Sequence, residues 1–425
     1  MPDPNNLPIE EIEFPVNFNF STIKVVEIKF TAPEFLEGSV FEIYRKFENQ
    51  NILVSKGTFD FNNAYFNSVS VPVITDSLFV VSRTFGLEKY IELPIIGNKV
   101  TYDYGYHYNA PREVAMSAQT GLKSAFVDNF SYMGAYTANG YPSYLFKVND
   151  HAWETLFSNL NQTLPEGVSV PLTKPAFFES GKQSNLVLKE KSNVYITFAG
   201  EGTDQTSSLG YFIYDGSKPV GTQHKIIFPN ASYPGSGGSL HSGDQVLLGE
   251  FPANTVIGWF LVPNGLNKQQ KLVKDVNGIY YSVPSFNPEV IDELNQHMIL
   301  LKDIQNEVIV LGFEDLPRNS ASCDNDFNDV VFYITLDRLE AADLSNVNNT
   351  ISSVDTDGDG IIDSLDQYPL DPTMAFNNGG GASAAGSIAF EDLWPFKGDY
   401  DFNDLIIDYQ FNPITDANNL IKVLE

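Results

Sequence analysis

Twelve residues at 355–366, DTDGDGIIDSLD, have the composition and spacing of a calcium-binding loop. Aspartates occupy loop positions 1, 3, 5, 9 and 12, a glycine occupies position 6, and the residue at position 7 offers its main-chain carbonyl: Asp355, Asp357, Asp359, Asp363, Asp366, Gly360 and Ile361. Calcium takes about six to eight oxygen ligands, and the glycine permits the sharp turn that brings oxygens from both halves of the loop together. The sequence therefore predicts a Ca²⁺ site here.

The flanks of this loop favour an isolated calcium loop in an extended linker over an EF-hand. SNVNNTISSV precedes it and QYPLDP follows it, and neither stretch has the pattern of a helix. Asp366 also stands where an EF-hand carries a bidentate glutamate. The alternative is a solvated acidic turn without metal, but five carboxylates within twelve residues repel one another unless a cation neutralises them.

A second acidic motif occurs twice and combines FED-L, a variable loop, D-x-D-F-N-D and an apolar strand. The first copy contains Glu314, Asp315, Asp324, Asp326, Asn328 and Asp329. The second copy contains Glu391, Asp392, Asp399, Asp401, Asn403 and Asp404. In an extended segment the first Asp, the second Asp and the Asn of each D-x-D-F-N-D share a face with the apolar residues of the strand that follows.

Buried carboxylates cost several kcal/mol each without a compensating partner, and basic residues are too few here to serve. A cation is the simplest partner, and Glu314 or Asp315 in the first copy, and Glu391 or Asp392 in the second, would reach it from the adjacent strand. The alternative is that these Asp and Asn side chains cap a tight turn by accepting hydrogen bonds from backbone amides.

The composition limits the partners of the chain. It has 425 residues, 43% of them hydrophobic, and a formal net charge of −29, which opposes binding to nucleic acid or to an anionic membrane surface. Cys323 is the only cysteine, so the chain has neither an internal disulfide nor a thiolate zinc site. No apolar run is long enough to span a membrane, and we interpret the opening MPDPNNLPIEE as a start placed after a removed export signal.

Alternating apolar and polar residues predict an all-β protein. We expect a small immunoglobulin- or fibronectin-like β-sandwich, an irregular connector, a central calcium-binding sandwich of jelly-roll type with one helix, a calcium loop with a Gly/Ala/Ser linker, and the start of a further, truncated β domain. The corresponding ranges are 9–104, 105–149, 150–345, 346–386 and 387–425. The helix begins after Asp150 and ends at Leu164-Pro165, and its apolar stripe consists of Trp153, Leu156, Phe157 and Leu160.

Catalytic motifs are weak. The glycine-rich stretch 235–244, GSGGSLHSGD, precedes a strand and has no lysine at the position that a phosphate-binding loop requires. Ser239 and His241 lie close in sequence, but their neighbours do not form a nucleophile elbow. We therefore predict no enzymatic activity.

From about residue 130 to 425 the chain resembles the LruC-type surface proteins common in Bacteroidota. The resemblance rests on NVYITFAGEG, LGYFIYD, IGWFLVPNG and the two FED-DFND signatures, and the calcium loop resembles a thrombospondin type 3 repeat. It implies calcium-binding β domains and export to the cell surface, as a secreted protein or an outer-membrane lipoprotein. In relatives the domain that begins at Phe390 continues well beyond the position of Glu425.

These observations predict an exported, non-catalytic, calcium-binding surface protein that acts in adhesion, binding or domain positioning. Calcium would close the 355–366 loop, stiffen the hinge before the 377–386 linker and fix the last domain on the central one. The ligand, a protein or a glycan, is not identifiable from the sequence. One alternative is a calcium-dependent carbohydrate-binding module that uses Trp394, and a weaker one is a glycoside hydrolase that uses two of the acids.

Overall fold

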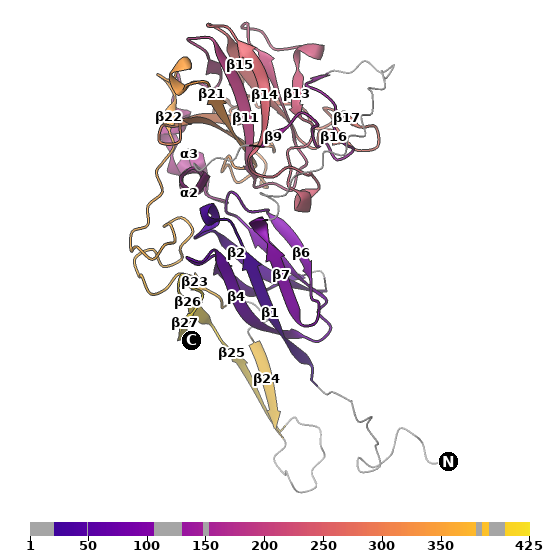
Figure 1. Ribbon diagram of the computed structural model, residues 1–425, viewed down its shortest axis with the longest axis vertical. Coiled ribbons are helices and arrows are strands. Elements are labelled where there is room, and N and C mark those ends of the chain that lie inside the picture. The colour runs from indigo at the N-terminus through magenta and orange to yellow at the C-terminus, as the bar shows by residue number, and fades with distance from the viewer. Residues whose placement is uncertain (1–20, 49, 106–129, 148–152, 380–384, 391–403) are drawn as a thin grey trace, which may run out of the picture.

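The computed structural model describes residues 21–48, 50–105, 130–147, 153–379, 385–390 and 404–425. The prediction of an all-β protein is confirmed. Two β-sandwiches lie one beyond the other along the molecule, and the C-terminal strands return to the side of the N-terminal one (Figure 1). Within the described residues, no helix has the length and apolar character needed to cross a lipid bilayer.

The N-terminal sandwich packs a three-stranded sheet, in the order β4-β1-β7, against a four-stranded sheet, in the order β3-β2-β5-β6. In β1 the even-numbered apolar residues Val26, Ile28 and Phe30 are buried and their neighbours are more exposed, because successive side chains of a strand point to opposite faces. The strands are β1 (Ile23–Thr31), β2 (Val40–Phe47), β3 (Gln50–Thr58), β4 (Ala64–Pro72), β5 (Ser77–Ser82), β6 (Tyr90–Pro94) and β7 (Lys99–Asp103).

The central sandwich pairs a six-stranded sheet, β10-β15-β12-β13-β8 with β18 on β15, and a seven-stranded sheet, β22-β19-β20-β21-β11-β14-β9. A short hairpin, β16-β17, lies outside both sheets. The strands are β8 (Ser131–Tyr132), β9 (Phe146–Lys147), β10 (Leu186–Val187), β11 (Ser192–Glu201), β12 (Ser208–Ile213), β13 (Lys225–Phe228), β14 (Asp244–Phe251), β15 (Val256–Val262), β16 (Leu266–Asn267), β17 (Leu272–Val273), β18 (Tyr280–Tyr281), β19 (Met298–Asp303), β20 (Val308–Phe313), β21 (Val330–Leu336) and β22 (Asn348–Asn349).

The segment predicted to be an irregular connector contributes to both central sheets. β8 adds to the six-stranded sheet beside β13, and β9 adds to the seven-stranded sheet beside β14. Each strand is two residues long, too short for the alternation of side chains to be visible in the sequence.

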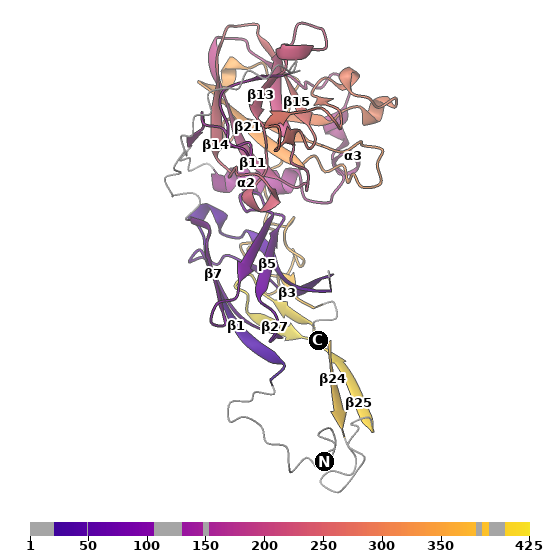
Figure 2. The same cartoon turned by 90° about the vertical axis from the view of Figure 1, so that its right-hand side faces the viewer.

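The seven-stranded sheet is buried on both faces. One face forms the main core with the six-stranded sheet, and the other is covered by α2 (Trp153–Thr163), where Leu156, Phe157 and Leu160 of the predicted stripe are buried. A second, short helix, α3 (Val170–Thr173), follows, where the sequence predicted only one. Helix α2 lies at the junction of the two sandwiches (Figure 2), and its Phe157 ring is 6.3 Å from that of Phe35.

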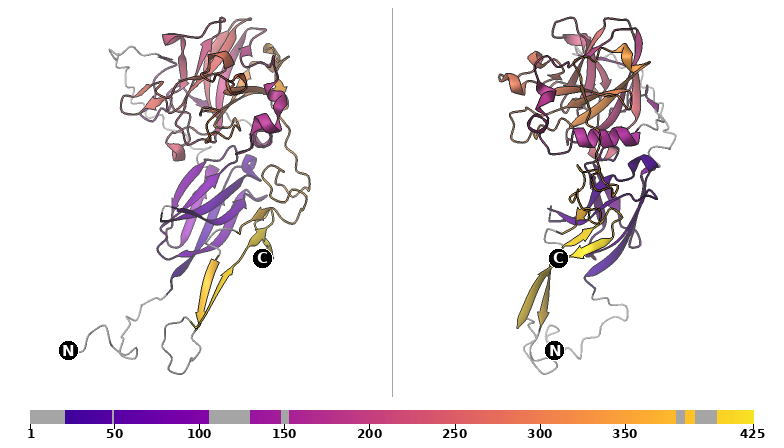
Figure 3. Two further views of the ribbon diagram at one scale, coloured as in Figure 1. Left: turned by 180° about the vertical axis from the view of Figure 1, so that it is seen from behind. Right: turned by 90° about the vertical axis from the view of Figure 1, so that its left-hand side faces the viewer.

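The C-terminal strands are associated with the N-terminal sandwich and not with the central one. β23 (Phe376–Asn377), β26 (Pro413–Thr415) and β27 (Ile421–Leu424) form a small sheet beside β3 (Figure 2). There Asn419 accepts a hydrogen bond from the Thr58 amide and donates one to its carbonyl, both 3.0 Å long. The remaining pair, β24 (Ala385–Phe390) and β25 (Leu405–Gln410), forms a hairpin that projects from the same end (Figure 3).

Candidate metal centres

The predicted calcium loop brings three of its aspartates together. One carboxylate oxygen from each of Asp355, Asp357 and Asp359 lies within 4.8 Å of the other two. Asp355 accepts hydrogen bonds from the amides of Gly358 and Gly360, at 2.8 and 2.9 Å. Both glycines have positive φ, +78° and +100°, a conformation that side chains disfavour, so the predicted need for glycine at position 6 is confirmed.

Three carboxylate oxygens in this loop are buried and have no hydrogen-bond partner among the described residues: Oδ2 of Asp357, of Asp359 and of Asp366. Asp366 is 9% exposed, and burial raises its pKa to about 6, with further contributions from repulsion by Asp359, Asp357 and Asp355. Desolvated, unpaired oxygens that repel one another are unfavourable unless a cation joins them. The donor set, all oxygen, fits Ca²⁺.

Asp363 has a different role from these residues. Its two carboxylate oxygens accept hydrogen bonds from the Thr356 amide at 2.8 Å and from the Thr356 hydroxyl at 2.7 Å. Ile361 donates its amide hydrogen to Asp359 and buries its side chain in a small apolar cluster with Ala375, Phe376 and Ala417. The loop is thereby attached to the small C-terminal sheet.

The loop also contacts the N-terminal sandwich. Val40 at the start of β2 packs against the apolar cluster that contains Ile361. The Gly360 carbonyl oxygen would lie 2.8 Å from a Cβ atom placed on Gly38. The sequence predicted that the loop acts between the central domain and the last one, whereas its contacts here are with the first sandwich and the sheet beside it.

In the first FED-DNDFND motif, two of the carboxylates support a turn. Glu314 accepts hydrogen bonds from the Phe327 amide at 2.7 Å and from the Cys323 thiol at 2.8 Å. Asp326 accepts from the amides of Gly167 and Asn328, at 2.8 and 3.1 Å. The turn is sharp, since Asn325 and Phe327 both have φ near +60°. For Asp326, this is the capping arrangement that the alternative interpretation predicted, and Glu314 supports the same turn although that interpretation did not include it.

Asp315 and Asp329 belong to the same acidic cluster. Asp315 donates its amide hydrogen to Asp329 at 2.7 Å and accepts a bond from the Ser207 hydroxyl at 2.9 Å, but its Oδ1 is buried without a partner among the described residues. Burial, as the main cause, raises the pKa of Asp315 to about 6. It also raises the pKa of Asp329 well above the usual value of an aspartate. Burial likewise raises the pKa of Glu314 to about 7 and that of Asp326 to about 8.

A glutamate that the sequence did not single out joins this cluster. One carboxylate oxygen from each of Glu166, Asp324 and Asp326 lies within 4.8 Å of the other two, so Glu166 takes the place that we had predicted for Glu314 or Asp315. Asp324 is exposed, Glu166 is half-buried and Asp326 is buried. Glu166 follows helix α2, and it belongs to no motif, so only the packing of α2 on the sheet places it here.

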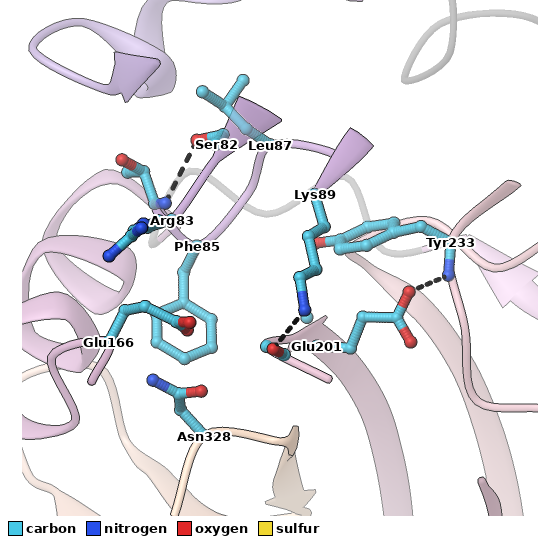
Figure 4. A pocket seen from close by; sticks show the side chains of 12 residues that line it. Ser82, Arg83, Phe85, Leu87, Lys89, Glu166, Glu201, Tyr233 and Asn328 are labelled. Carbon is cyan, nitrogen blue, oxygen red and sulfur yellow. Dashed lines mark hydrogen bonds between the residues drawn. The ribbon is translucent and has the colours of Figure 1, made fainter. Parts of the chain in front are cut away.

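Glu166 also borders a cavity between the two sandwiches. Figure 4 shows its side chain next to Asn328, with Lys89, from the segment between β5 and β6, on the opposite side of the view. The Lys89 ammonium donates a hydrogen bond to the Gly202 carbonyl. Nearby, the buried Glu201 accepts a bond from the Tyr233 amide at 2.9 Å, and burial raises its pKa to about 8.

Most of the second copy of the motif lies outside the described residues. These are Glu391, Asp392, Asp399, Asp401 and Asn403. Asp404 is described, and it is exposed directly before β25. The calcium prediction for this copy therefore stays a prediction.

Residues 251–337 match the model of a family described as a domain of unknown function, DUF4114. This segment runs from the end of β14 to just beyond β21 and contains the whole first acidic motif. No curated protein matches the chain. The crystal structure of a 9R-lipoxygenase from Cyanothece PCC8801 gives a TM-score of 0.13 and 11% identity over 62% of this chain and 43% of that chain, and a similarity this low carries no argument.

Proposed function

We propose that this protein binds calcium and acts by binding a partner and by holding its domains in place, without a catalytic step. The observation that carries the proposal is the Asp366 carboxylate. One of its oxygens accepts the Tyr368 amide at 2.7 Å, and the other is buried, unpaired within the described residues, and repelled by Asp355, Asp357 and Asp359. These four aspartates would hold the ion, which would supply the positive charge that the loop lacks.

Calcium in this loop would act through the contacts that the loop makes. Without metal, repulsion among the carboxylates opposes the closed turn, whereas the closed turn places Ile361 and Gly360 against the sheet β23-β26-β27 and the N-terminal sandwich. A bound ion would therefore fasten the segment that returns from the central sandwich to the first one. Extracellular calcium modules bind at roughly 10⁻⁴ to 10⁻³ M, so the loop would be loaded in millimolar calcium.

We also propose a second, separate calcium site at Glu166, Asp324 and Asp326, beside the junction of the two sandwiches. The hydrogen bonds that Asp326 receives from two amides hold its carboxylate in position, and the exposed Asp324 gives the ion access from solvent. An extracellular or cell-surface location, as in LruC-type proteins, is part of the proposal because it matches this calcium dependence.

The test is calcium titration by calorimetry on chelator-stripped full-length protein, paired with thermal melts. We expect the wild type to bind at least two ions and to melt at higher temperature when loaded. The variant Asp357→Ala with Asp359→Ala should lose one site, and Glu166→Gln should weaken the other.

Asp371→Ala is the matched control, because this half-buried aspartate follows the loop closely but caps a turn through Thr373. It should bind calcium like the wild type. Absence of both heat and a melting shift in the wild type would refute the calcium proposal and leave the acidic motifs as turn-forming sequences.

A further inference from the structure

An open cavity of about 400 Å³ lies where the N-terminal sandwich, the segment around the end of α2, and the calcium loop meet. Its polar lining includes Lys56 and Arg83 from the sandwich, Asn161 and Glu166 from the α2 segment, and Ser364 and Gln367 from the calcium loop and the residue just after it. Cavities of this size hold ligands as large as a disaccharide, and sites between domains are common places for them. This cavity lies next to the one in Figure 4, because Arg83 and Glu166 line both cavities.

Three side chains in the lining of this cavity offer hydrogen-bond donors to a ligand, beside the carboxylates of Glu42 and Glu166. The Asn161 Oδ1 already accepts the Phe85 amide at 3.0 Å, and the Gln367 Oε1 accepts the Asn377 amide at 2.7 Å. No described residue accepts a hydrogen bond from the side-chain NH₂ group of either, so both remain available. The Ser364 hydroxyl is buried and has no partner among the described residues. A ligand that supplies acceptors would satisfy these groups.

Of the two cations in the lining, one forms an ion pair and the other, Arg83, forms none with the described residues. Lys56 forms an ion pair with Glu42 at 2.9 Å, and Glu42 also accepts the Tyr44 hydroxyl. Arg83 forms no ion pair or hydrogen bond through its guanidinium with another described residue, although it is close enough to Glu42 and Glu166 to favour their charged forms. A guanidinium binds a carboxylate through two parallel hydrogen bonds.

The apolar side chains of the lining can pack against the C–H groups on the face of a ligand ring. Val40, Val81, Pro165, Val168 and Leu365 contribute to the walls. A saccharide offers such faces together with many oxygen acceptors, whereas a simple dicarboxylic acid would leave the apolar wall and the amide donors uncovered. The donors, the guanidinium of Arg83, which has no partner among the described residues, and the apolar walls together favour an acidic sugar.

We propose that this cavity binds a saccharide that carries a carboxylate, such as a uronic acid, with the carboxylate on Arg83 and the ring oxygens on Asn161, Gln367 and Ser364. This inference rests on the proposed function, because Ser364 and Leu365 belong to the calcium loop. Calcium would order one wall of the cavity, so that saccharide binding depends on calcium although the sugar does not have to touch the ion.

The experiment measures binding of digalacturonate to the calcium-loaded full-length protein by ligand-observed NMR and calorimetry. The methyl ester of digalacturonate is the control ligand without the negative charges. Acetylated dialanine, which has a free carboxylate, tests whether the cavity binds the C-terminal end of a peptide instead of a saccharide. We expect digalacturonate to bind at least tenfold more tightly than the ester and the peptide. Arg83→Gln should lose this preference, while Arg45→Gln on β2, which does not line the cavity, should keep it.

Three results would overturn the inference: no binding of digalacturonate to calcium-loaded protein, equal binding of the ester, or an unchanged affinity in Arg83→Gln. Tighter binding of the peptide would refute the assignment to a saccharide. Calcium titration of Arg83→Gln separates the two proposals, because this variant should bind calcium at the 355–366 loop like the wild type. Conversely, Asp357→Ala with Asp359→Ala should lose both calcium at the loop and digalacturonate.

Discussion

The carbonyl oxygen of Gly360 occupies the space that a side chain on Gly38 would need. A Cβ atom on Gly38 would lie 2.8 Å from that oxygen, and Gly38 has a φ of +72°. Gly38 follows the single turn Glu34–Leu36 of the N-terminal sandwich, whereas Gly360 is the turn residue of the calcium loop. Two backbones thus meet without side chains between them, and their approach sets the position of the loop.

Gly38→Ala should therefore destabilise the protein by about 2 kcal/mol and weaken calcium binding at the loop, because it adds both backbone strain and a steric conflict. Gly97→Ala is the matched control, since Gly97 has a φ of +59° but no atom lies within 4 Å of its added Cβ. Its cost should be about 1 kcal/mol, with calcium affinity unchanged. Urea unfolding and calorimetry measure both quantities, and equal behaviour of the two variants would contradict the contact.

Asp366→Asn tests the role of the unpaired oxygen. The amide can still accept the Tyr368 hydrogen bond, but it removes one negative charge from the proposed ligand set. We expect calcium affinity at the loop to fall roughly tenfold, and the metal-free protein to be as stable as the wild type or more stable, because one repulsion is gone. A variant that binds calcium normally would show that Asp366 is not a ligand.

Arg318→Lys tests the buried guanidinium beside the first acidic motif. Arg318 donates to the Asn325 side chain at 2.8 Å and to the carbonyls of Glu293 and Gln296 at 3.0 Å, and it lies over the Phe327 ring. Lysine has fewer donors and no planar group, so the loss should be about 2 kcal/mol in urea unfolding. The exposed Arg338, which pairs with Glu190, is the control, and Arg338→Lys should cost less than about 0.5 kcal/mol.

Glu201 gives a prediction about pH. Burial raises its pKa in the folded protein to about 8, well above the usual value of 4.5, so the folded state retains a proton that the unfolded state loses. The wild type should therefore become less stable as the pH rises from about 4.5 to 8. Glu201→Gln, measured in parallel by urea unfolding at fixed calcium, should show a smaller decline, and parallel curves for the two proteins would contradict the assignment.

The sequence was sufficient to predict the fold class and the position of the main helix, because both depend on periodic burial. Val26, Ile28 and Phe30 alternate as a strand requires, and Leu156, Phe157 and Leu160 follow helical spacing. The return of the C-terminal strands to β3 could not be predicted, since it depends on single polar contacts such as that of Asn419 with Thr58, between residues far apart in the chain.

The candidate sites likewise include parts that the sequence could predict and parts that it could not. The calcium loop is local, so its spacing alone predicted the convergence of Asp355, Asp357 and Asp359. In the first FED motif, alternation along an extended chain was the wrong geometry, because the positive φ of Asn325 and Phe327 turns the chain sharply. Glu314 therefore supports the turn, and Glu166 reaches the cluster from an element that no sequence motif connects with it.

The attachment of the C-terminal sheet to the N-terminal sandwich also has a consequence for the order of folding. Strand β3 is synthesised early, but the partner of Thr58 is Asn419, near the end of the chain. The first sandwich can form its own core as soon as it is synthesised, yet its outer layer must wait until synthesis has passed Asn419. The central sandwich is in effect an insertion between β7 and β23, within a unit that combines residues 23–103 with residues 376–424, so removal of β26 and β27 would expose β3 of the first sandwich.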